Sequence, residues 1–583
     1  MKPVATSLAV ETEIAKTEAS ARPPGRTPLY ADPRKGTRTF RVALVTPSVV
    51  PAWVSSLMDL VADNPWLELS AIPVTGRTPS QPVEVPFDLS LFLALDRLLV
   101  RRVISIRRDT ASTLSGTPLA RRPGVAIEPE AQQGEGSEGM RARLERLKPD
   151  LVLLIGFEEW ATIMADVAPW GCWVLDASLV NGKHAGLPLL TPILNGEDAT
   201  PLCLELGLAP DRVVPLGTAW GSTRAMSFSQ HRDLAFVKLP AMVMSVLRNL
   251  ADGVLPIPRQ QAAVLRLAPP REAYRAGTGF GVFWATVRHA VQWVPQWRRN
   301  HKPWFVLLRN AGTSLDPASP QMGPNSVLVA PPGDYWADPF AVEHGHRQFV
   351  FVEEWVGLRR LGIIVCLELL PDGNAQRLGV VLDEDSHMSY PQVFQWEGVW
   401  YMTVENGAAR RVSLYRATDF PLGWERVADL ITDQVCFDPT LHPWQGMWYL
   451  FGNVSECFVN ASDDLFLFVS ERLEGPYRPH PSNPIVCDVR CSRPAGQLFL
   501  EKGQLIRPAQ CSVPVYGAAI VFNQVITLSP TDYSERPIGR LDPGWAPSLD
   551  GCHTYNKALT LEVLDAHGEP PGNGVRINVL DRG

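Results

Sequence analysis

Polar and charged side chains recur at fixed spacing in the second half of this sequence. The residues that directly precede four well-spaced prolines, together with the matching residue of a fifth and weaker segment, are Asp338, Tyr390, Asp438, Arg493 and His553. Fourteen residues after the first three prolines stand Glu353, Glu405 and Asn453. Glycosidic chemistry needs two carboxyl groups, because one must stay protonated as the acid while the other acts as base or nucleophile. These residues therefore predict a carbohydrate site in one shared pocket, with Tyr390 and nearby Trp336 at its wall.

Two other interpretations of the same residues stay open. Asp-Pro pairs such as Asp338-Pro339 and Asp438-Pro439 often form turns, and acids beside them can accept hydrogen bonds from backbone amides. The pocket could also bind a sugar through its acids and aromatic rings without cleaving or transferring it.

The elements that must position these residues form a repeat. The prolines Pro339, Pro391, Pro439 and Pro494 lie 52, 48 and 55 residues apart, and a fifth unit begins near His553. Each proline is followed by a glycine-containing turn and an apolar or aromatic strand. A period near 50 residues with paired strands is typical of a propeller blade, so five units predict a five-bladed β-propeller. The segment 304–308 is expected to supply the strand that closes the ring, and a β-sandwich is the alternative.

The first half of the chain has a different pattern. Compact apolar runs at 40–45, 67–72, 151–156 and 171–176 alternate with helical stretches at 53–63 and 140–147. Apolar residues also recur at helical spacing between 231 and 253. Strands that alternate with helices predict a doubly wound parallel α/β sheet. The expected division is a disordered leader at 1–39, an α/β domain at 40–255, a helical or irregular linker at 256–302 and the propeller at 303–583.

Composition narrows the classes of function. The 583 residues are 45% hydrophobic, which excludes a wholly disordered chain, and the net charge of -7 argues against nucleic acid as a partner. The 53 Pro and 18 Trp indicate many turns and short strands. Cys487 and Cys491 have no second pair nearby, so no metal site is expected. The leader lacks an apolar signal core and no stretch of membrane-spanning length is evident, so a cytoplasmic protein with reduced thiols is expected.

The propeller half resembles a known domain. The segments YWADPF, HMSYPQVFQWEGVWYM, FDPTLHPWQGMWYLF, RCSRPAGQL and CHTYN carry this resemblance. It is similar to the propeller found at the N-terminus of plant glucosamine inositolphosphorylceramide transferases and, more remotely, to the arabinanase- and invertase-type glycoside hydrolases. The hydrolase likeness implies Asp338 as base or nucleophile, Asp438 as the residue that orients the sugar or tunes a pKa, and Glu405 as the acid, with Glu353 as its competitor. The resemblance implies a carbohydrate or glycoconjugate partner.

The first half resembles a folate-dependent formyltransferase domain, through WVLDASLVNGKHAGLPLLTPILNGEDATPLCLEL and the stretch that follows. That family needs an Asn, a His two residues later and a distant Asp. Here Val174 and Asp176 stand at the first two places, and Asp211 is the remaining candidate. Valine has no donor and an ionised aspartate cannot stabilise an oxyanion, so formyl transfer is expected to be lost.

Three functions are therefore open before the structure is considered. The first is a carbohydrate-associated protein of glycan or glycoconjugate biosynthesis, with catalytic candidates Asp338, Glu405 and Asp438 and binding candidates Glu353, Tyr390, Asn453, Arg493, His553 and Trp336. The second is formyl transfer to an amino sugar, which alone would require a reduced folate as cofactor. The third is a catalytically silent interaction protein. The oligomeric state, the sugar and the linkage are left open.

Overall fold

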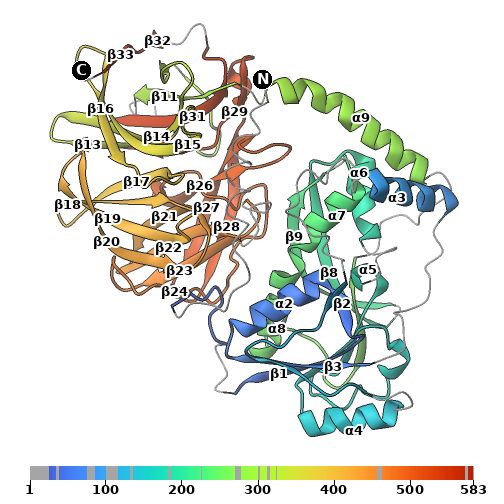
Figure 1. Cartoon of the computed structure of the whole chain (residues 1–583). Helices are drawn as coiled ribbons and strands as arrows, with labels where there is room; N and C mark the ends of the chain where they lie inside the picture. Colours follow the sequence, from blue (N-terminus) through green and yellow to red (C-terminus); the bar gives the residue numbers. More distant parts are fainter. Residues whose placement is uncertain are drawn as a thin grey trace. The chain divides into compact units, whose positions relative to one another are not determined.

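A computed structural model of the chain shows two compact units (Figure 1). It describes residues 25–33, 38–74, 86–99, 116–131, 136–180, 186–209, 211–224, 226–268, 278–299, 302–310, 315–323, 325–455, 462–571 and 575–581. One unit combines Met1–Ala31 with Trp293–Gly583, and the other is Asp32–Gln292. The second unit is thus inserted between two parts of the first.

Unit Asp32–Gln292 is built on an eight-stranded, mostly parallel sheet in the order β5-β3-β1-β6-β7-β10-β8-β9. The strands are β1 Phe40–Thr46, β3 Leu67–Pro73, β5 Val125–Ile127, β6 Leu151–Leu154, β7 Cys172–Leu175, β8 Ala199–Ala209, β9 Arg212–Ser222 and β10 Ala262–Leu267. Strands β1, β3, β5, β6, β7 and β10 run parallel, whereas β8 and β9 are antiparallel to their neighbours. The expected α/β class is confirmed.

Helices complete this unit. They are α2 Ala52–Ala62, α3 Phe87–Leu99, α4 Ser137–Leu147, α5 Ala177–Val180, α6 Leu190–Asn195, α7 Phe228–Phe236 and α8 Leu239–Ala251, with a short β2 Val49–Pro51 and β4 Gly116–Pro118 pair. Helix α9 Thr278–Arg299 begins in this unit and ends in the other. Strand β10 lies in the segment 256–302 that was expected to be a linker, and it pairs with β7 and β8. The α/β sheet therefore extends beyond residue 255.

One helical stretch among the described residues, Phe228–Ala251, is long and apolar enough to cross a membrane by length and composition. On these criteria the expectation that no such stretch exists was wrong. However, 72% of its most apolar window is buried inside the fold, and α8 packs against α2 and β9. A buried core helix meets the same criteria, so this stretch is weak evidence for a membrane span.

The other unit is a five-bladed β-propeller, as the repeat predicts. Blade 1 contains β13 Tyr335–His344, β14 Arg347–Val356, β15 Leu361–Leu369 and β16 Ala375–Leu382, with β33 Val579–Asp581 at its edge. Blade 2 contains β17 Ser389–Trp396, β18 Val399–Glu405, β19 Arg411–Asp419 and β20 Gly423–Thr432. Blade 3 contains β21 Cys436–Trp444, β22 Met447–Val454, β23 Leu465–Ser470 and β24 Arg478–Pro479. Blade 4 contains β25 Phe499–Glu501, β26 Gln504–Cys511, β27 Ala519–Leu528 and β28 Tyr533–Leu541.

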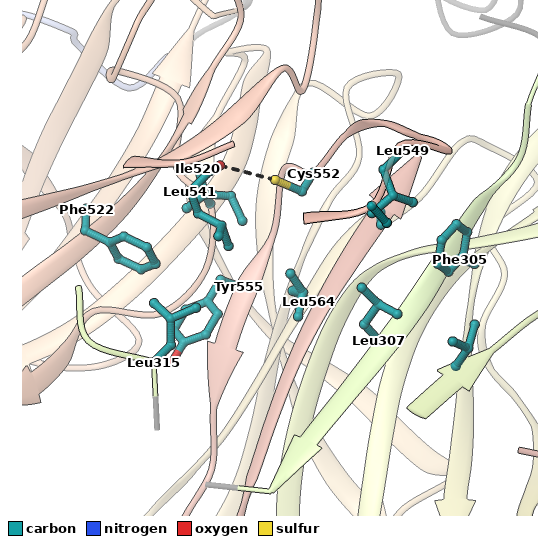
Figure 2. Close-up of a cluster of buried hydrophobic side chains, with 14 of the residues drawn as sticks. Phe305, Leu307, Leu315, Ile520, Phe522, Leu541, Leu549, Cys552, Tyr555 and Leu564 are labelled. Carbon is teal, nitrogen blue, oxygen red and sulfur yellow. Dashed lines mark hydrogen bonds between the residues drawn. The ribbon is translucent and has the colours of Figure 1, made fainter. Parts of the chain in front are cut away.

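The fifth blade is assembled from both ends of the propeller sequence. Strand β11 Trp304–Asn310 pairs with β31 Leu561–Gly568, so the predicted closing strand is confirmed. The remaining strands of this sheet are β12 Ser326–Leu328, β29 Leu549–Gly551, β30 Tyr555–Lys557 and β32 Val575–Arg576. Phe305 and Leu307 of β11 are buried in one apolar cluster with Phe522 of blade 4 and Leu564 of blade 5 (Figure 2). Ring closure is therefore sealed by side-chain packing as well as by backbone pairing.

Residues 25–31, within the expected disordered leader, pack against blades 2 and 3. The backbone of Thr27 donates to the Thr432 carbonyl at 3.0 Å, and Gln434 Nε2 donates to the Thr27 carbonyl at 2.7 Å. Tyr30 is 4% exposed and meets the edge of Phe466 with 6.0 Å between ring centroids. The leader prediction is thus wrong for this segment, because a buried aromatic ring and paired backbone groups fix it.

Candidate functional site

The innermost strands of the first three blades share an unusual backbone feature. Asp338, Tyr390 and Asp438 have φ of 50, 52 and 48°, in the left-handed region that residues other than glycine seldom adopt. Each stands at an interruption of the register between the first and second strand of its blade. A β-bulge re-aims the side chain at its position. The repeat therefore uses one local distortion to turn three side chains out of the regular strand alternation.

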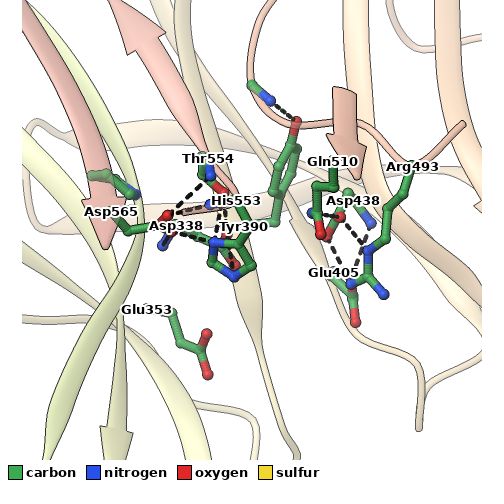
Figure 3. A network of polar contacts seen from close by, with 12 residues as sticks. Asp338, Glu353, Tyr390, Glu405, Asp438, Arg493, Gln510, His553, Thr554 and Asp565 are labelled. Atoms are coloured by element: carbon green, nitrogen blue, oxygen red, sulfur yellow. Dashed lines mark hydrogen bonds and ion pairs between the residues drawn. The ribbon is translucent and has the colours of Figure 1, made fainter. Parts of the chain in front are cut away.

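Blades 1 and 5 together form the His553 cluster, defined here as Asp338, His553, Thr554 and Asp565 (Figure 3). His553 Nδ1 lies 2.5 Å from Asp565 Oδ2, and its Nε2 lies 3.8 Å from Asp338 Oδ1. Thr554 Oγ1 donates to Asp338 Oδ1 at 2.6 Å, and the Asp338 amide donates to Asp565 Oδ2 at 3.1 Å. The imidazole is thus held between two carboxyl groups.

Blades 2, 3 and 4 together form the Arg493 cluster, defined as Glu405, Asp438, Arg493 and Gln510 (Figure 3). Arg493 donates to both oxygens of Asp438, at 2.6 and 3.3 Å, and its Nη2 lies 3.8 Å from Glu405 Oε2. Gln510 Nε2 donates to Asp438 Oδ2 at 2.7 Å. The amide of Asp438 donates to Glu405 Oε2 at 2.9 Å. Since all five blades contribute to the two clusters, the predicted acids, Arg493 and His553 do converge at the propeller centre.

The second strands of blades 1, 2 and 3 supply a further set of equivalent positions. Glu353, Glu405 and Asn453 each pair with the residue just before Asp338, Tyr390 and Asp438, respectively. The spacing of fourteen residues in the sequence therefore corresponds to equivalent positions in these three blades. Glu405 is bonded, but Glu353 Oε1, both side-chain amide atoms of Asn453 and Gln510 Oε1 are buried without a hydrogen-bond partner in the described part of the chain. Buried polar atoms in proteins normally have partners, so this unpaired set points to a polar ligand or water.

The charged groups of the site are almost entirely buried. These residues are between 0 and 7% exposed. Tyr516 is 43% exposed and reaches both clusters, with its ring 5.0 Å from the Arg493 guanidinium carbon and 5.3 Å from the His553 ring. Trp304 stacks on His553 at 4.0 Å between centroids. An aromatic surface therefore lies next to the buried polar groups.

Burial dominates the protonation of the acids. It raises the pKa of Asp338 to about 6, against the opposing charge of His553 and with the help of Asp438. Burial also raises the pKa of Glu353 well above its ordinary value, together with the charges of Asp338 and Glu405. The pKa of Glu405 is likewise raised, by burial and then by the charge of Asp438. Burial lowers the pKa of His553, but the charges of Asp565 and Asp338 outweigh this and leave it raised.

Two predicted wall residues have other roles. Trp336 is fully buried in the apolar core of blade 1, and its Nε1 donates to Glu354 Oε2 at 2.9 Å. Its place at the wall was a wrong prediction, because the bulge after Ala337 breaks the alternation that would have put Trp336 and Asp338 on one face. Tyr390 is at the centre but fully buried, and its hydroxyl bonds to Thr440 Oγ1 at 2.9 Å and to the Gly496 amide at 2.6 Å. It ties blades 2, 3 and 4 together.

One group among the described residues could hold a metal ion. Asp338, His553 and Asp565 each offer a ligand atom, all within 4.8 Å of one another. Imidazole and carboxylate donors suit several divalent metals. In the structure the same atoms pair with each other through the imidazole, so a metal would have to displace that contact.

Sequence reasoning missed several members of the network. Asp565, Gln510, Thr554, Tyr516 and His387 were not singled out. Asp565 interrupts the apolar run 563–566 of β31, which is a signal that could have found it. Gln510 escaped because the offset of fourteen residues from Pro494 leads to Pro508 instead.

The positions named in the α/β unit do not form a catalytic set. Val174 is 2% exposed within β7. Asp176 follows the carboxyl end of β7, where its Oδ1 accepts a hydrogen bond from the Ser178 amide at 2.8 Å. Asp211 is exposed in the turn between β8 and β9. Strand β10 pairs with β7 on one side and with β8 on the other, and this pairing places the β8–β9 turn near the amino end of β7. Asp211 and Asp176 therefore lie at opposite ends of the sheet.

Comparisons with known proteins concern the propeller. Residues 307–556 match the family model described as "Glucosamine inositolphosphorylceramide transferase 1, N-terminal". The chain is 32% identical over 255 residues to "Glucosamine inositolphosphorylceramide transferase 1" of Oryza sativa subsp. japonica, which covers 43% of this chain and 34% of that protein. With the protein of the same name from Arabidopsis thaliana it shares 31% over 208 residues, covering 35% of this chain and 27% of that protein. The chain thus spans about a third of the length of these relatives.

Solved structures give a weaker likeness. The family 117 glycoside hydrolase Zg3597 of Zobellia galactanivorans matches with a TM-score of 0.30 and 12% identity, covering 45% of this chain and 91% of that one. CoXyl43, a β-xylosidase/α-arabinofuranosidase from a compost microbial metagenome, matches with a TM-score of 0.30 and 12% identity, covering 42% and 94%. Likeness at these scores carries no argument about function.

Proposed function

We propose that the propeller binds a sugar unit of a glycan or glycoconjugate at its central network, and that the chain acts in glycoconjugate biosynthesis. The relatives support this, since their name includes the sugar glucosamine together with inositolphosphorylceramide. Because the chain spans only about a third of the length of those proteins, a role in glycoconjugate biosynthesis is proposed for this chain by analogy with them.

The observation that carries the proposal is the set of buried, unpaired polar atoms at the propeller centre. Glu353 and Gln510 each offer a free acceptor oxygen, and Asn453 offers a donor and an acceptor. An unpaired buried polar group costs about 1–3 kcal/mol, so a ligand that pairs with these groups gains that free energy. Sugar hydroxyls both donate and accept, and the apolar face of a sugar ring can pack on an aromatic side chain such as Tyr516. The chemistry of the site fits a sugar better than an apolar ligand.

A glycan panel tests this directly. The full chain, Asp338→Asn and the control Asp385→Asn are titrated with each glycan that binds on an array. The control has the same substitution at a side chain that is 98% exposed in the connection between blades 1 and 2. We expect the control to bind like the parent chain and Asp338→Asn to lose at least tenfold in affinity. Absence of binding across a broad panel, or unchanged binding by Asp338→Asn, would overturn the proposal.

We further propose the finer roles of base or nucleophile for Asp338, acid for Glu405 and orienting residue for Asp438. Burial favours a protonated Glu405, as an acid requires, whereas Arg493 and Gln510 hold Asp438 in place. Release of nitrophenol from a series of nitrophenyl glycosides tests this. Glu405→Gln should slow poor leaving groups more than good ones, because only poor leaving groups need protonation. An equal loss of rate for all leaving groups, or no turnover by the parent chain, would contradict these catalytic roles. Sugar binding without catalysis would then remain as the proposed function.

A further inference from the structure

Two helices of the α/β unit carry large apolar side chains on their outer faces. In α3 the buried residues Leu89, Leu93 and Asp96 share one face, and exposed apolar residues recur four apart on the other. The first turns of α9 are arranged in the same way, with Val282 and Ala285 buried. The outer faces carry six apolar residues that are 49–83% exposed, namely Phe87, Leu91, Leu95, Phe280, Phe283 and Trp284. A surface helix normally turns its apolar stripe toward the core, so these outer faces need another explanation.

The six residues form one surface, called here the α3–α9 patch. The Gly279 amide at the start of α9 donates to Asp88 Oδ2 of α3 at 2.8 Å, and the two helices meet there (Figure 1). A Cβ on Gly279 would lie 2.3 Å from the Asp88 carbonyl oxygen, so the two backbones are in close contact. On α9 the Trp284 ring lies against Phe280 and Phe283, with 6.1 and 5.8 Å between ring centroids. A contiguous exposed apolar patch of this kind marks an interaction surface.

Both helices belong to basic stretches of the sequence, although the whole chain has a net charge of -7. Between residues 273 and 302 there are four Arg and one Lys but no Asp or Glu. Residues 97–108, which include the end of α3, contain five Arg and no acid. Arg288 is exposed one turn after Trp284. The patch is therefore accompanied by positive charge, which suits a negatively charged partner.

We propose that the α3–α9 patch docks the chain on the surface of an anionic lipid bilayer. Helices that lie in a membrane interface combine Phe, Trp and Leu on one face with Lys and Arg, and they bind through apolar burial together with attraction to anionic lipids. Tryptophan in particular is enriched at the level of the headgroups. Trp284 and its two neighbouring rings enter the interface, and Arg288 supplies positive charge beside them. This inference concerns the α/β unit and does not depend on the sugar site.

A second copy of the chain suits the patch less well. A twofold contact brings the same surface of two copies together, and with it the same basic stretches. Like charges placed against each other oppose association. An anionic bilayer covers the apolar rings and attracts the basic residues at the same time. Self-association through the patch is therefore an outcome of the test.

Co-sedimentation of the full chain with lipid vesicles tests the inference. One set of vesicles is phosphatidylcholine alone, and the other is phosphatidylcholine with phosphatidylserine in a ratio of about seven to three. We expect at least tenfold tighter binding to the anionic vesicles, because several basic residues near such a surface each contribute. Added salt should weaken this binding, since it screens exposed charges. Equal binding to both kinds of vesicle, or binding to neither, would overturn the inference, and this comparison needs no variant to fold.

A double variant locates the contact on the patch. Phe283→Ser with Trp284→Ser removes two exposed rings and should lower binding to the anionic vesicles at least tenfold, with the thermal unfolding midpoint unchanged. The control, Leu358→Ser with Leu559→Ser, removes two apolar side chains that are 99 and 88% exposed in the propeller. It should bind like the parent chain. Equal binding by the double variant and the control would contradict the proposed contact.

Arg288→Gln separates the contribution of charge from that of the aromatic rings. It should weaken binding to the anionic vesicles about fivefold, which is the contribution of one basic residue near an anionic surface. Binding to phosphatidylcholine alone should stay the same. An equal effect on both kinds of vesicle would show that Arg288 does not face anionic lipid.

Two further measurements report where the patch lies. Vesicles with bromine on their acyl chains quench tryptophan fluorescence in the interface, so the parent chain should be quenched more than Trp284→Phe. Equal quenching would place Trp284 outside the bilayer and overturn the inference. Sedimentation velocity without vesicles is the last arm. A dimer that the double variant abolishes, in a chain that binds no vesicles, would assign the patch to a second copy instead.

Discussion

At residue scale, the centre of the propeller depends on side chains held by a distorted backbone. Left-handed φ at Asp338, Tyr390 and Asp438 costs free energy in a residue with a side chain, about 1–3 kcal/mol each. Tyr390 uses its position to hold three blades together, whereas the two aspartates use theirs to enter the charged clusters. The same distortion thus serves structure at one blade and the proposed ligand site at two others.

Asp338 should give stability a measurable pH dependence. Below about pH 4 this carboxyl group is protonated in both folded and unfolded chains. As the pH rises to about 6, its folded-state pKa, it ionises in the unfolded chain first, so the folded state holds more protons and the free energy of unfolding falls. The full loss is of the order of 3 kcal/mol, reached above pH 6. Asp338→Asn, which tolerates the same φ, should remove this part of the fall in urea unfolding curves between pH 4 and 7. A curve parallel to that of the parent chain would contradict it.

Arg493 should be the most costly single charge to remove. Its partner Asp438 is 1% exposed, and Glu405 shares the same guanidinium. Arg493→Met leaves both acids without their counter-charge and should lower the free energy of unfolding by about 3–5 kcal/mol. The double variant with Asp438→Asn should recover part of this loss. Arg359→Met, which breaks more exposed ion pairs, should cost less than about 1 kcal/mol. Similar small losses for both arginines would show that the cluster is not buried as described.

The sequence predicted many of the polar residues at the propeller centre, but it predicted few of the contacts that they make. The proline anchors aligned blades 1, 2 and 3, which placed Glu353, Glu405 and Asn453 correctly. Blades 4 and 5 depart from that spacing, so Gln510 and Asp565 were not found. Pairing between distant side chains, such as Asp438 with Arg493, depends on the closed ring and leaves no local mark in the sequence.

At the scale of elements, the strands with a strong apolar run were predictable and the mixed ones were not. The buried strands β1, β3, β6 and β7 and the helices α2 and α4 lie close to their expected places. Strand β10 was missed because it is short, contains Arg266 and follows a proline-rich stretch. Helix α9 lies in the segment 256–302, which was expected to be helical or irregular, and its bounds were not predicted because Gly281 and Pro295 interrupt its pattern. Tertiary pairing decides such segments where local preference is weak.

The segment 25–31 should behave as a structural part of the propeller. Tyr30→Ala removes a ring that is 4% exposed and should cost about 3–5 kcal/mol of propeller stability. Thermal unfolding followed by near-ultraviolet circular dichroism measures the effect as a lower midpoint. Pro28→Ala, at an exposed position two residues away, is the control and should leave the midpoint unchanged. Equal midpoints for Tyr30→Ala and the control would mean that the segment adds no stability.

At the scale of the whole molecule, two compact units with separate cores should unfold as two transitions. Gly171 has φ +79°, and a Cβ there would lie 2.0 Å from the Gln261 carbonyl oxygen. Gly171→Ala should therefore lower the transition of the α/β unit in calorimetry and leave that of the propeller in place. Gly217→Ala, where a Cβ meets nothing within 4 Å, should shift neither. A joint shift of both transitions by Gly171→Ala would show that the units are not independent.

The two units differ in how much the sequence indicates about their function. The fold class of both units followed from periodicity, whereas the matched family covers the propeller alone. Resemblance to formyltransferases put Val174, Asp176 and Asp211 at positions of that family where the chemistry was expected to be lost, and the register of the sheet places Asp211 at the opposite end from Asp176. The functional argument therefore rests on the propeller centre.

A crystal structure of the full chain soaked with the sugar that binds most tightly tests that argument most directly. The account predicts the sugar at the propeller centre, with hydrogen bonds to Glu353, Asn453 and Gln510 and with Tyr516 against its ring. A sugar bound elsewhere, with only water at these three side chains, would contradict it.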